Sequence, residues 1–129
     1  PFVDADYDPD RWAKAIRGRE RDPERGERCS LCFEMRLGKA ASYAAQKDFK
    51  VFTTSLGIAR WKDFEQVVRA GKRSARLFPG LVFWDFNWRK NGGSEQMISI
   101  SKQENFYRQQ YCGCFYSFQN SRAKKKNKS

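Results

Sequence analysis

The stretch LVFWDF, residues 81–86, is almost continuously apolar and aromatic. Such a run is typical of a strand that is buried on both faces of a sheet. A second strand is indicated at residues 50–56, KVFTTSL, and patterns typical of helices lie before and after it. Because helices alternate with strands, the sequence predicts an α/β fold with a parallel sheet.

Two helices are predicted before the first strand. Asp8 is placed to cap the first, which has Pro9 in its first turn and ends at Gly18. The second covers residues 29–47, which are rich in helix formers. Its apolar residues recur at steps of three and four and predict a buried face: Phe33, Leu37, Ala41 and Ala44.

Two more helices are predicted after that strand. One covers residues 64–71 and ends at Gly71, and the other covers residues 94–111 with Ser94 as its cap. We expect one α/β domain over residues 1–121 and a disordered basic tail over residues 122–129. Two strands are too few for a parallel sheet of this kind, so we also expect that an N-terminal βα part of the domain is missing from this chain.

The chain is strongly basic, with 26 Lys and Arg residues against 15 Asp and Glu residues and a net charge of +11. Five of the positive charges lie in the last eight residues, and the rest of the chain stays basic without them. This balance favours a polyanionic partner. No apolar run approaches the roughly 18 residues of a membrane-spanning helix, and the first residues lack the pattern of a signal peptide. We therefore expect a cytoplasmic protein with no membrane partner.

The sequence contains no histidine. This excludes Ser-His-Asp and Cys-His catalysis, zinc held by histidine, and the usual proton shuttle near neutral pH. Any chemistry must use cysteine, carboxylate, lysine, tyrosine or arginine side chains, or a cofactor.

All four cysteines fall into two close pairs, Cys29/Cys32 and Cys112/Cys114. At the start of a helix, the first pair has both sulfurs on one face, where free backbone N–H groups favour the thiolate form. Gly113 allows the second pair to turn tightly. Structural disulfides and a redox-active C-x-x-C motif explain the pattern less well than a site with four thiolates. Spacing alone does not distinguish a zinc site from an iron–sulfur cluster, and by itself favours zinc.

The residues around the cysteines resemble the QueH-type epoxyqueuosine reductase family. The resemblance extends from Tyr7 to Ser117, and its most specific parts are the block Arg28-Cys29-x-x-Cys32-x-x-x-Arg36-Leu37 and the block Tyr107-Arg108-Gln109-x-Tyr111-Cys112-Gly113-Cys114. It implies the last step of queuosine biosynthesis, the conversion of epoxyqueuosine to queuosine in the anticodon loop of tRNA. It also implies a [4Fe-4S] cluster with an additional iron, an electron donor not yet identified, and a nucleotide-hydrolase-like (HUP or Rossmann-like) parallel-sheet fold.

The chain departs from the family pattern in three places. The family's N-terminal cysteine motif is absent, so this chain is expected to be catalytically incomplete. The segment Ala59-Arg60-Trp61-Lys62 stands where family members tend to have Ser-Pro-x-Lys, and Ser55 replaces a threonine. Two alternatives remain open: a zinc-stabilised nucleic-acid-binding module, and an inactive truncated paralogue.

Candidate site residues follow from the motifs and their positions. The metal ligands would be Cys29, Cys32, Cys112 and Cys114. Removal of an epoxide oxygen also needs a proton donor. Because the chain has no histidine, the candidates are Asp85, Tyr107 and Tyr111. Asp85 lies at the C-terminal end of a predicted strand, where sites of open α/β sheets usually lie. Phosphate, ribose or base contacts are predicted for Lys62, Arg108, Thr53 and Thr54. The aromatic residues at positions 115, 116 and 118 are candidates for stacking on an unpaired base.

Overall fold

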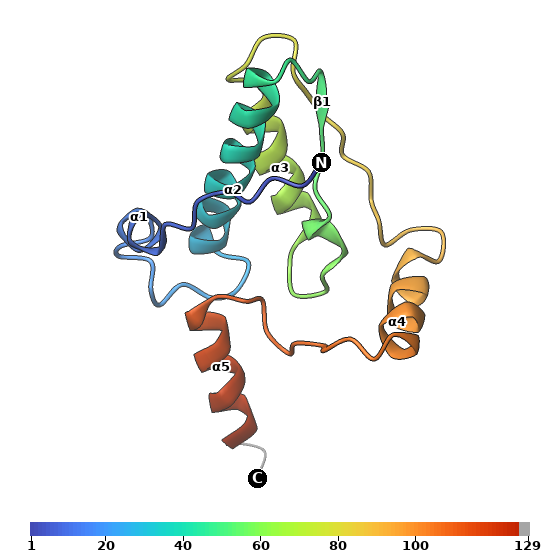
Figure 1. The fold of residues 1–129 in the computed structure, drawn as a ribbon. Coiled ribbons are helices and arrows are strands. Elements are labelled where there is room, and N and C mark those ends of the chain that lie inside the picture. The colour runs from blue at the N-terminus through green and yellow to red at the C-terminus, as the bar shows by residue number, and fades with distance from the viewer. Residues whose placement is uncertain (127–129) are drawn as a thin grey trace.

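The computed structural model describes the fold of residues 1–126, in which helices predominate. Figure 1 shows α2 and α3 side by side, with β1 beside them and with α4 and α5 reached by long connections. Within these residues, no helix is both long enough and apolar enough to cross a membrane. In chain order the elements are α1 (Pro9–Ala15), α2 (Glu27–Gln46), β1 (Val51–Phe52), a 3-10 helix η1 (Leu56–Ile58), α3 (Phe64–Ala75), β2 (Val82–Phe83), α4 (Gly93–Gln103) and α5 (Phe115–Lys126).

The two strands pair in parallel, with Val51 opposite Val82 and Phe52 opposite Phe83. The predicted α/β fold with a parallel sheet is therefore confirmed at this level. The expectation that the second strand is buried on both faces is wrong for the described chain, because Phe83 is 7% exposed and Val82 is 57% exposed. Successive side chains of a strand point to opposite faces, and α2 and α3 cover only the face that carries Phe52 and Phe83.

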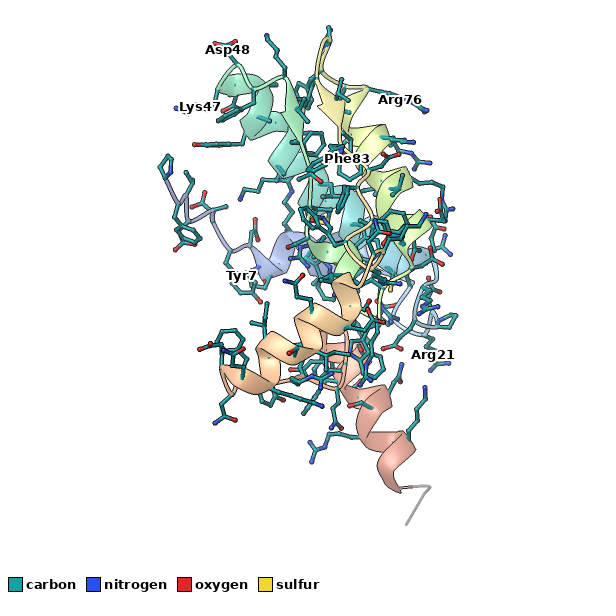
Figure 2. All side chains as sticks on the ribbon, turned by 90° about the vertical axis from the view of Figure 1, so that its right-hand side faces the viewer. Tyr7, Arg21, Lys47, Asp48, Arg76 and Phe83 are labelled. Atoms are coloured by element: carbon teal, nitrogen blue, oxygen red, sulfur yellow. The ribbon has the colours of Figure 1, made fainter. Side chains whose placement is uncertain are left out.

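The core lies between α2, α3 and the inner face of the sheet. All four residues of the predicted apolar stripe of α2 are buried, so this prediction is confirmed. Phe33 and Leu37 pack with Val67 and Ala70 of α3. Further along α2, its two stripe alanines pack against Leu81. In Figure 2, Phe83 lies within the packed layers, while Lys47 and Asp48 lie on one side and Arg76 on the other side of the end where α2 and α3 finish.

Gly71 lies inside α3, which continues to Ala75, so the predicted helix end at Gly71 is wrong. The reason is packing, because a Cβ atom at position 71 would lie 2.5 Å from Cζ of Phe83. The glycine lets the ring of Phe83 approach the helix backbone, and this role gives the same sequence signal as a helix end.

The ends of the other helices follow the predictions in part. Asp8 caps α1 as predicted, since its Oδ1 accepts a hydrogen bond from the N–H of Arg11 at 2.9 Å. The predicted cap at Ser94 is wrong: α4 begins at Gly93 after Gly92, whose φ of 79° is left-handed. It also ends at Gln103 rather than near Tyr111.

The predicted disordered tail begins within α5, which continues as a helix to Lys126. Residues 122–126 therefore differ from the prediction, and residues 127–129 lie outside the described chain. Alanine, lysine and arginine are good helix formers, which accounts for the extension. The aromatic run at positions 115–118 belongs to the first turn of this helix and not to a strand.

Candidate metal centre

The first cysteine pair lies in the first two turns of α2. Cys29 and Cys32 are both half-buried and free. The expectation that the helix start favours their thiolates is opposed by burial, which raises the pKa of both thiols above the ordinary value. A hydrogen bond with the backbone of Arg25, and to a smaller extent the charge of Arg28, partly offset the pKa shift at Cys29, and the indole of Trp12 partly offsets it at Cys32. Without a bound metal ion, these thiols therefore keep their protons at neutral pH.

The second pair lies on the turn that leads into α5. Gly113 has a φ of 116°, which a residue with a side chain rarely adopts, so its predicted role in a tight turn is confirmed. Cys112 and Cys114 are half-buried and free. The hydroxyl oxygen of Ser117 accepts a hydrogen bond from the N–H of Cys112 at 2.8 Å. The N–H of Ser117 in turn points to the sulfur of Cys114 at 3.4 Å.

One pocket brings one cysteine of the first pair together with both cysteines of the second pair, which is distant in sequence. Cys29, Cys112 and Cys114 line it, together with Arg28 and Lys62. Cys32 does not line this pocket, but it lies close enough for charges on Cys112 and Cys114 to raise its pKa. In the described residues, no three cysteine or carboxylate side chains lie close enough to hold a metal ion as they stand. Coordination would therefore require the thiols to converge.

Arg28 is the most deeply buried charged side chain of the pocket, with 1% of its surface exposed. Its Nη1 donates to the carbonyl oxygens of Arg19, Glu20 and Asp22 at 3.2, 3.0 and 2.7 Å. Its guanidinium carbon lies 4.9 Å from the ring centre of Tyr116. Its Nε and Nη2 have no hydrogen-bond partner in the described protein.

Buried donors without partners are rare in folded proteins because they lose their hydrogen bonds to water. Two unpartnered guanidinium nitrogens in a pocket with three thiols suit a negatively charged occupant, as a thiolate-bound metal centre would be. Lys62, which is 6% exposed, adds a second buried cation to the same pocket. The donor set therefore fits a centre of thiolates and metal.

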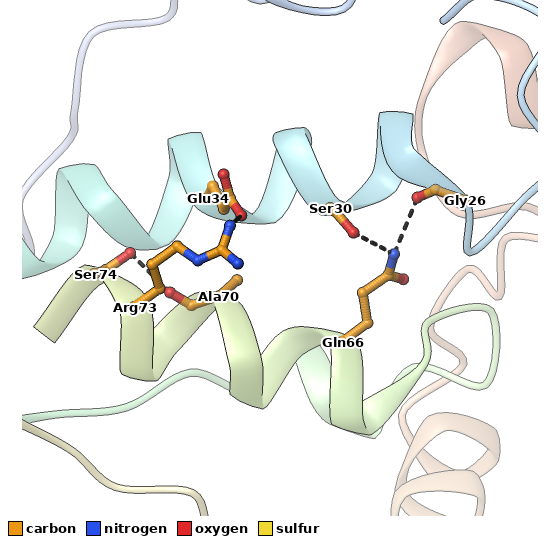
Figure 3. A network of polar contacts seen from close by, with 7 residues as sticks. All are labelled: Gly26, Ser30, Glu34, Gln66, Ala70, Arg73 and Ser74. Carbon is orange, nitrogen blue, oxygen red and sulfur yellow. Dashed lines mark hydrogen bonds and ion pairs between the residues drawn. The ribbon is translucent and has the colours of Figure 1, made fainter. Parts of the chain in front are cut away.

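Polar bridges between α2 and α3 hold this end of the fold together. Figure 3 shows that Nε2 of Gln66, on α3, donates to the carbonyl oxygen of Gly26 at 3.0 Å and to the hydroxyl oxygen of Ser30 at 2.7 Å. Further along the two helices, Arg73 of α3 forms an ion pair with Glu34 of α2. Gln66 is buried and lines the pocket as well. These contacts fix the start of α2, and with it Cys29, against α3.

Most of the other predicted site residues lie away from the pocket. Among them, only Lys62 lines it. The hydroxyl of Thr53 donates to the carbonyl oxygen of Trp84 at 2.7 Å, and that of Thr54 accepts from the N–H of Leu56 at 3.2 Å. Both hydroxyls thus support the loops at the carboxyl ends of the strands, and their predicted contact with substrate stays a prediction.

The proton-donor candidates differ in their surroundings. Asp85 forms an ion pair with Lys72 at 3.0 Å, and this partner lowers the pKa of its carboxyl group. A carboxylate of lowered pKa is a poor proton donor at neutral pH. Tyr107 is 85% exposed. Tyr111 is half-buried, and its ring centre lies 5.1 Å from that of Phe118. Of the three, Tyr111 is therefore the best shielded from water. Arg108 is exposed on the same connection.

Two residues of the site escaped the sequence analysis. Ser117 follows Cys114 by three positions, and this spacing at the start of a helix was the available signal. Glu24 lies in the connection between α1 and α2, and its carboxylate accepts the hydrogen bond of the Ser117 hydroxyl across 93 positions of sequence. No local pattern indicates such a contact.

Comparison with known proteins identifies the relatives of this chain. The family described as "Epoxyqueuosine reductase QueH" matches residues 1–120. Proteins named epoxyqueuosine reductase QueH are 52% identical in Acinetobacter baylyi, 54% in Histophilus somni and 54% in Haemophilus influenzae. Each match covers 94% of this chain and 56%, 50% and 49% of the respective relative. The chain thus spans about half the length of the curated relatives it matches.

Proposed function

Because the chain belongs to the QueH family of epoxyqueuosine reductases, we propose that it is part of a tRNA-modifying oxidoreductase. The proposed reaction converts epoxyqueuosine to queuosine in the anticodon loop. Two electrons and two protons remove the epoxide oxygen as water and leave a carbon–carbon double bond. The electrons come from a donor still to be identified.

The observation that carries the proposal is the shared pocket. Cys29 meets Cys112 and Cys114, which lie more than 80 positions away in sequence, beside two buried cations, and Cys32 lies close to this pocket. A protein that used each pair separately would not need this arrangement. The proposed occupant is a [4Fe-4S] cluster, held by Cys29, Cys32, Cys112 and Cys114, with an additional iron nearby. Zinc is the competing occupant, since it accepts the same four ligands.

When bound, the iron centre supplies electrons and polarises the epoxide oxygen. The residues of this chain hold and shield it. The four cysteines are half-buried, which limits the access of water to their thiols, and the buried Arg28 and Lys62 offset the negative charge of four thiolates. Tyr111, which directly precedes Cys112, is the proposed proton donor because its hydroxyl belongs to a half-buried side chain next to the metal ligands.

The proposed substrate contacts lie on the connection between α4 and α5. Tyr107 and Arg108 are both exposed there, a few residues before the second cysteine pair. A tyrosine ring and a guanidinium group can each stack on an unpaired base, as recognition of RNA loops requires. The excess of basic residues would add affinity for the tRNA backbone. For the fold we propose a nucleotide-hydrolase-like class, which the parallel pair of strands supports.

The test is metal analysis after anaerobic purification, together with an assay on tRNA that carries epoxyqueuosine. We expect iron and acid-labile sulfide in the wild-type protein, and their loss in each of four variants, Cys29→Ser, Cys32→Ser, Cys112→Ser and Cys114→Ser. Far-UV circular dichroism of each variant checks that the helices remain. A colourless protein that contains stoichiometric zinc and no iron would overturn the proposal in favour of a structural metal site.

A further inference from the structure

Cys112 is held by two buried side chains, one on each of its main-chain polar groups. Its N–H donates to the hydroxyl oxygen of Ser117 at 2.8 Å. Its carbonyl oxygen accepts from Nζ of Lys62 at 3.2 Å. Resting on the metal site of the proposed function, we propose that Ser117 and Lys62 are positioning residues that fix Cys112 as a metal ligand.

Ser117 connects both cysteines of the second pair to a distant part of the chain. Besides its bond to Cys112, its own N–H points to the sulfur of Cys114. Its hydroxyl hydrogen goes to the carboxylate of Glu24, which lies shortly before the helix of the first pair. With 1% of its surface exposed, Ser117 has no water to replace these partners. Its removal would leave the Cys112 N–H and the Glu24 carboxylate without their partner.

Lys62 contacts the carbonyl group of Cys112, whereas Ser117 contacts its N–H group. The backbone of Lys62 is itself anchored. Nη2 of Arg89 donates to the carbonyl oxygens of Ala59 and Lys62 at 2.6 and 2.7 Å. The N–H of Lys62 also donates to the carbonyl oxygen of Ala59 at 3.0 Å. Because Lys62 is buried and its Nζ is bonded to Cys112, its ammonium group is not a mobile surface charge.

An ammonium group carries three N–H donors, and in the described residues that of Lys62 has one protein partner, the carbonyl oxygen of Cys112. Because Lys62 is 6% exposed and lines the pocket with Cys29, Cys112 and Cys114, its other donors are available to thiolates there. Residues that orient metal ligands in this way typically change metal affinity by about 10- to 100-fold when they are mutated.

The experiment titrates the reduced, metal-free chain with Co²⁺, which reports thiolate ligation through its absorption in the visible and near ultraviolet. Ser117→Ala and Lys62→Met are the test variants. Ser121→Ala is the control for the first, since in the described part of the chain the Ser121 hydroxyl bonds locally, to the carbonyl oxygen of Phe118 on the same helix. Lys39→Met is the control for the second, because Lys39 also donates to a carbonyl oxygen, that of Asp6 at 3.0 Å, and does not line the cysteine pocket.

We expect each test variant to bind Co²⁺ about 10-fold or more weakly, and both controls to bind like the wild type. The reduction potential of the iron-loaded protein should also shift in the test variants, because hydrogen bonds near the sulfurs change. A role confined to folding would lower the melting temperature but leave the Co²⁺ affinity of the folded protein unchanged, and that result would overturn the inference.

Two further outcomes separate the inference from the proposed function. If wild-type protein gives no thiolate-to-cobalt absorption, the metal site itself is refuted. If it does and both test variants match it, only the positioning role is refuted. Should the truncated side chains prevent folding, Ser117→Thr and Lys62→Arg keep the hydroxyl and a cationic donor. Near wild-type Co²⁺ affinity in these variants supports the inference, and weak binding in a folded one refutes it.

Discussion

Gly71→Ala tests whether the close contact between α3 and the sheet limits the stability of this fold. A Cβ atom at position 71 would lie 2.5 Å from Cζ of Phe83 and 2.6 Å from its Cδ1 and Cε1. Atoms of folded proteins do not approach so closely, so the ring would have to move. The ring is 7% exposed and packs against Phe52, Val68 and Ala75, which leaves it little space.

Two opposing effects set the size of the change. Alanine is favoured over glycine inside a helix by about 1 kcal/mol. Forcing an extra methyl group into a packed core costs about 1–3 kcal/mol. Because Phe83 is enclosed on several sides, we expect the steric cost to exceed the gain. The net loss in the free energy of unfolding should then be roughly 1 kcal/mol, up to about 2 kcal/mol.

Gly38→Ala is the matched control, since Gly38 lies inside α2 and a Cβ atom there would meet only the hydroxyl oxygen of Ser74, at 3.9 Å. This is an ordinary contact, so the helix preference acts alone and the variant should gain about 0.5–1 kcal/mol. Urea unfolding followed by circular dichroism measures both changes. Equal effects of the two substitutions, or a stabilised Gly71→Ala, would refute the packing argument. In the Phe83→Leu background, where the ring is absent, Gly71→Ala should lower the free energy of unfolding by less than it does in the wild type. A double-mutant cycle measures this difference.

Four further predictions concern the helix cap, the surface ion pair, the cysteines and RNA binding. Asp63→Ala removes the oxygen that accepts from the N–H of Gln66 at 2.9 Å, and thermal unfolding should show a loss of about 1 kcal/mol, with an unchanged midpoint counting against the cap. Lys72 lowers the pKa of Asp85, so the pair stabilises the fold above the ordinary Asp pKa and loses its effect as pH falls through the lowered one. Urea midpoints of Asp85→Asn and wild type should therefore differ slightly near neutral pH and converge in acid, and a gap that widens in acid would contradict this sign. In pulse alkylation at increasing urea concentrations, Cys112 and Cys114 should react before Cys29 and Cys32. The reverse order would show that the turn with Cys112 and Cys114 resists unfolding more than the start of α2 does. Affinity for tRNA should fall linearly with log salt in a filter-binding assay, while a flat response would exclude a dominant role of the basic residues.

The parts of the fold that depend on periodicity could be predicted from the sequence. The apolar stripe of α2 and the cap at Asp8 are both local patterns, and the structure contains both. The positions of Gly71 and Ser94 misled because the same residue types serve several purposes. Gly71 makes room for Phe83, and Gly92 with its left-handed backbone precedes α4 where a serine cap was expected.

The candidate site divides in the same way. That each pair of cysteines lies close together follows from spacing, and the turn at Gly113 follows from its residue type. The contacts of Ser117 and Lys62 with Cys112 do not follow, since Lys62 is 50 positions away from Cys112 in sequence. Lysine side chains usually lie on the surface of a protein. The burial of Lys62 is therefore visible only in the tertiary structure.

The two cysteine pairs are therefore held in place by different kinds of interaction. The first pair belongs to α2, whose apolar residues pack against α3 and against the sheet and so set its position. The second belongs to a turn held by hydrogen bonds with Lys62 and Ser117. The aromatic contacts at α5 behind it, Tyr111 with Phe118 and Trp12 with Tyr116, lie outside the core between α2, α3 and the sheet. Hydrogen bonds depend on geometry far more sharply than apolar contacts do. The first pair can thus form with the core of the fold, whereas the second reaches its place only when parts of the chain that are distant in sequence already lie together. A metal bound between them would stabilise the docked turn by mass action, so the weaker half of the site gains the most from its occupant.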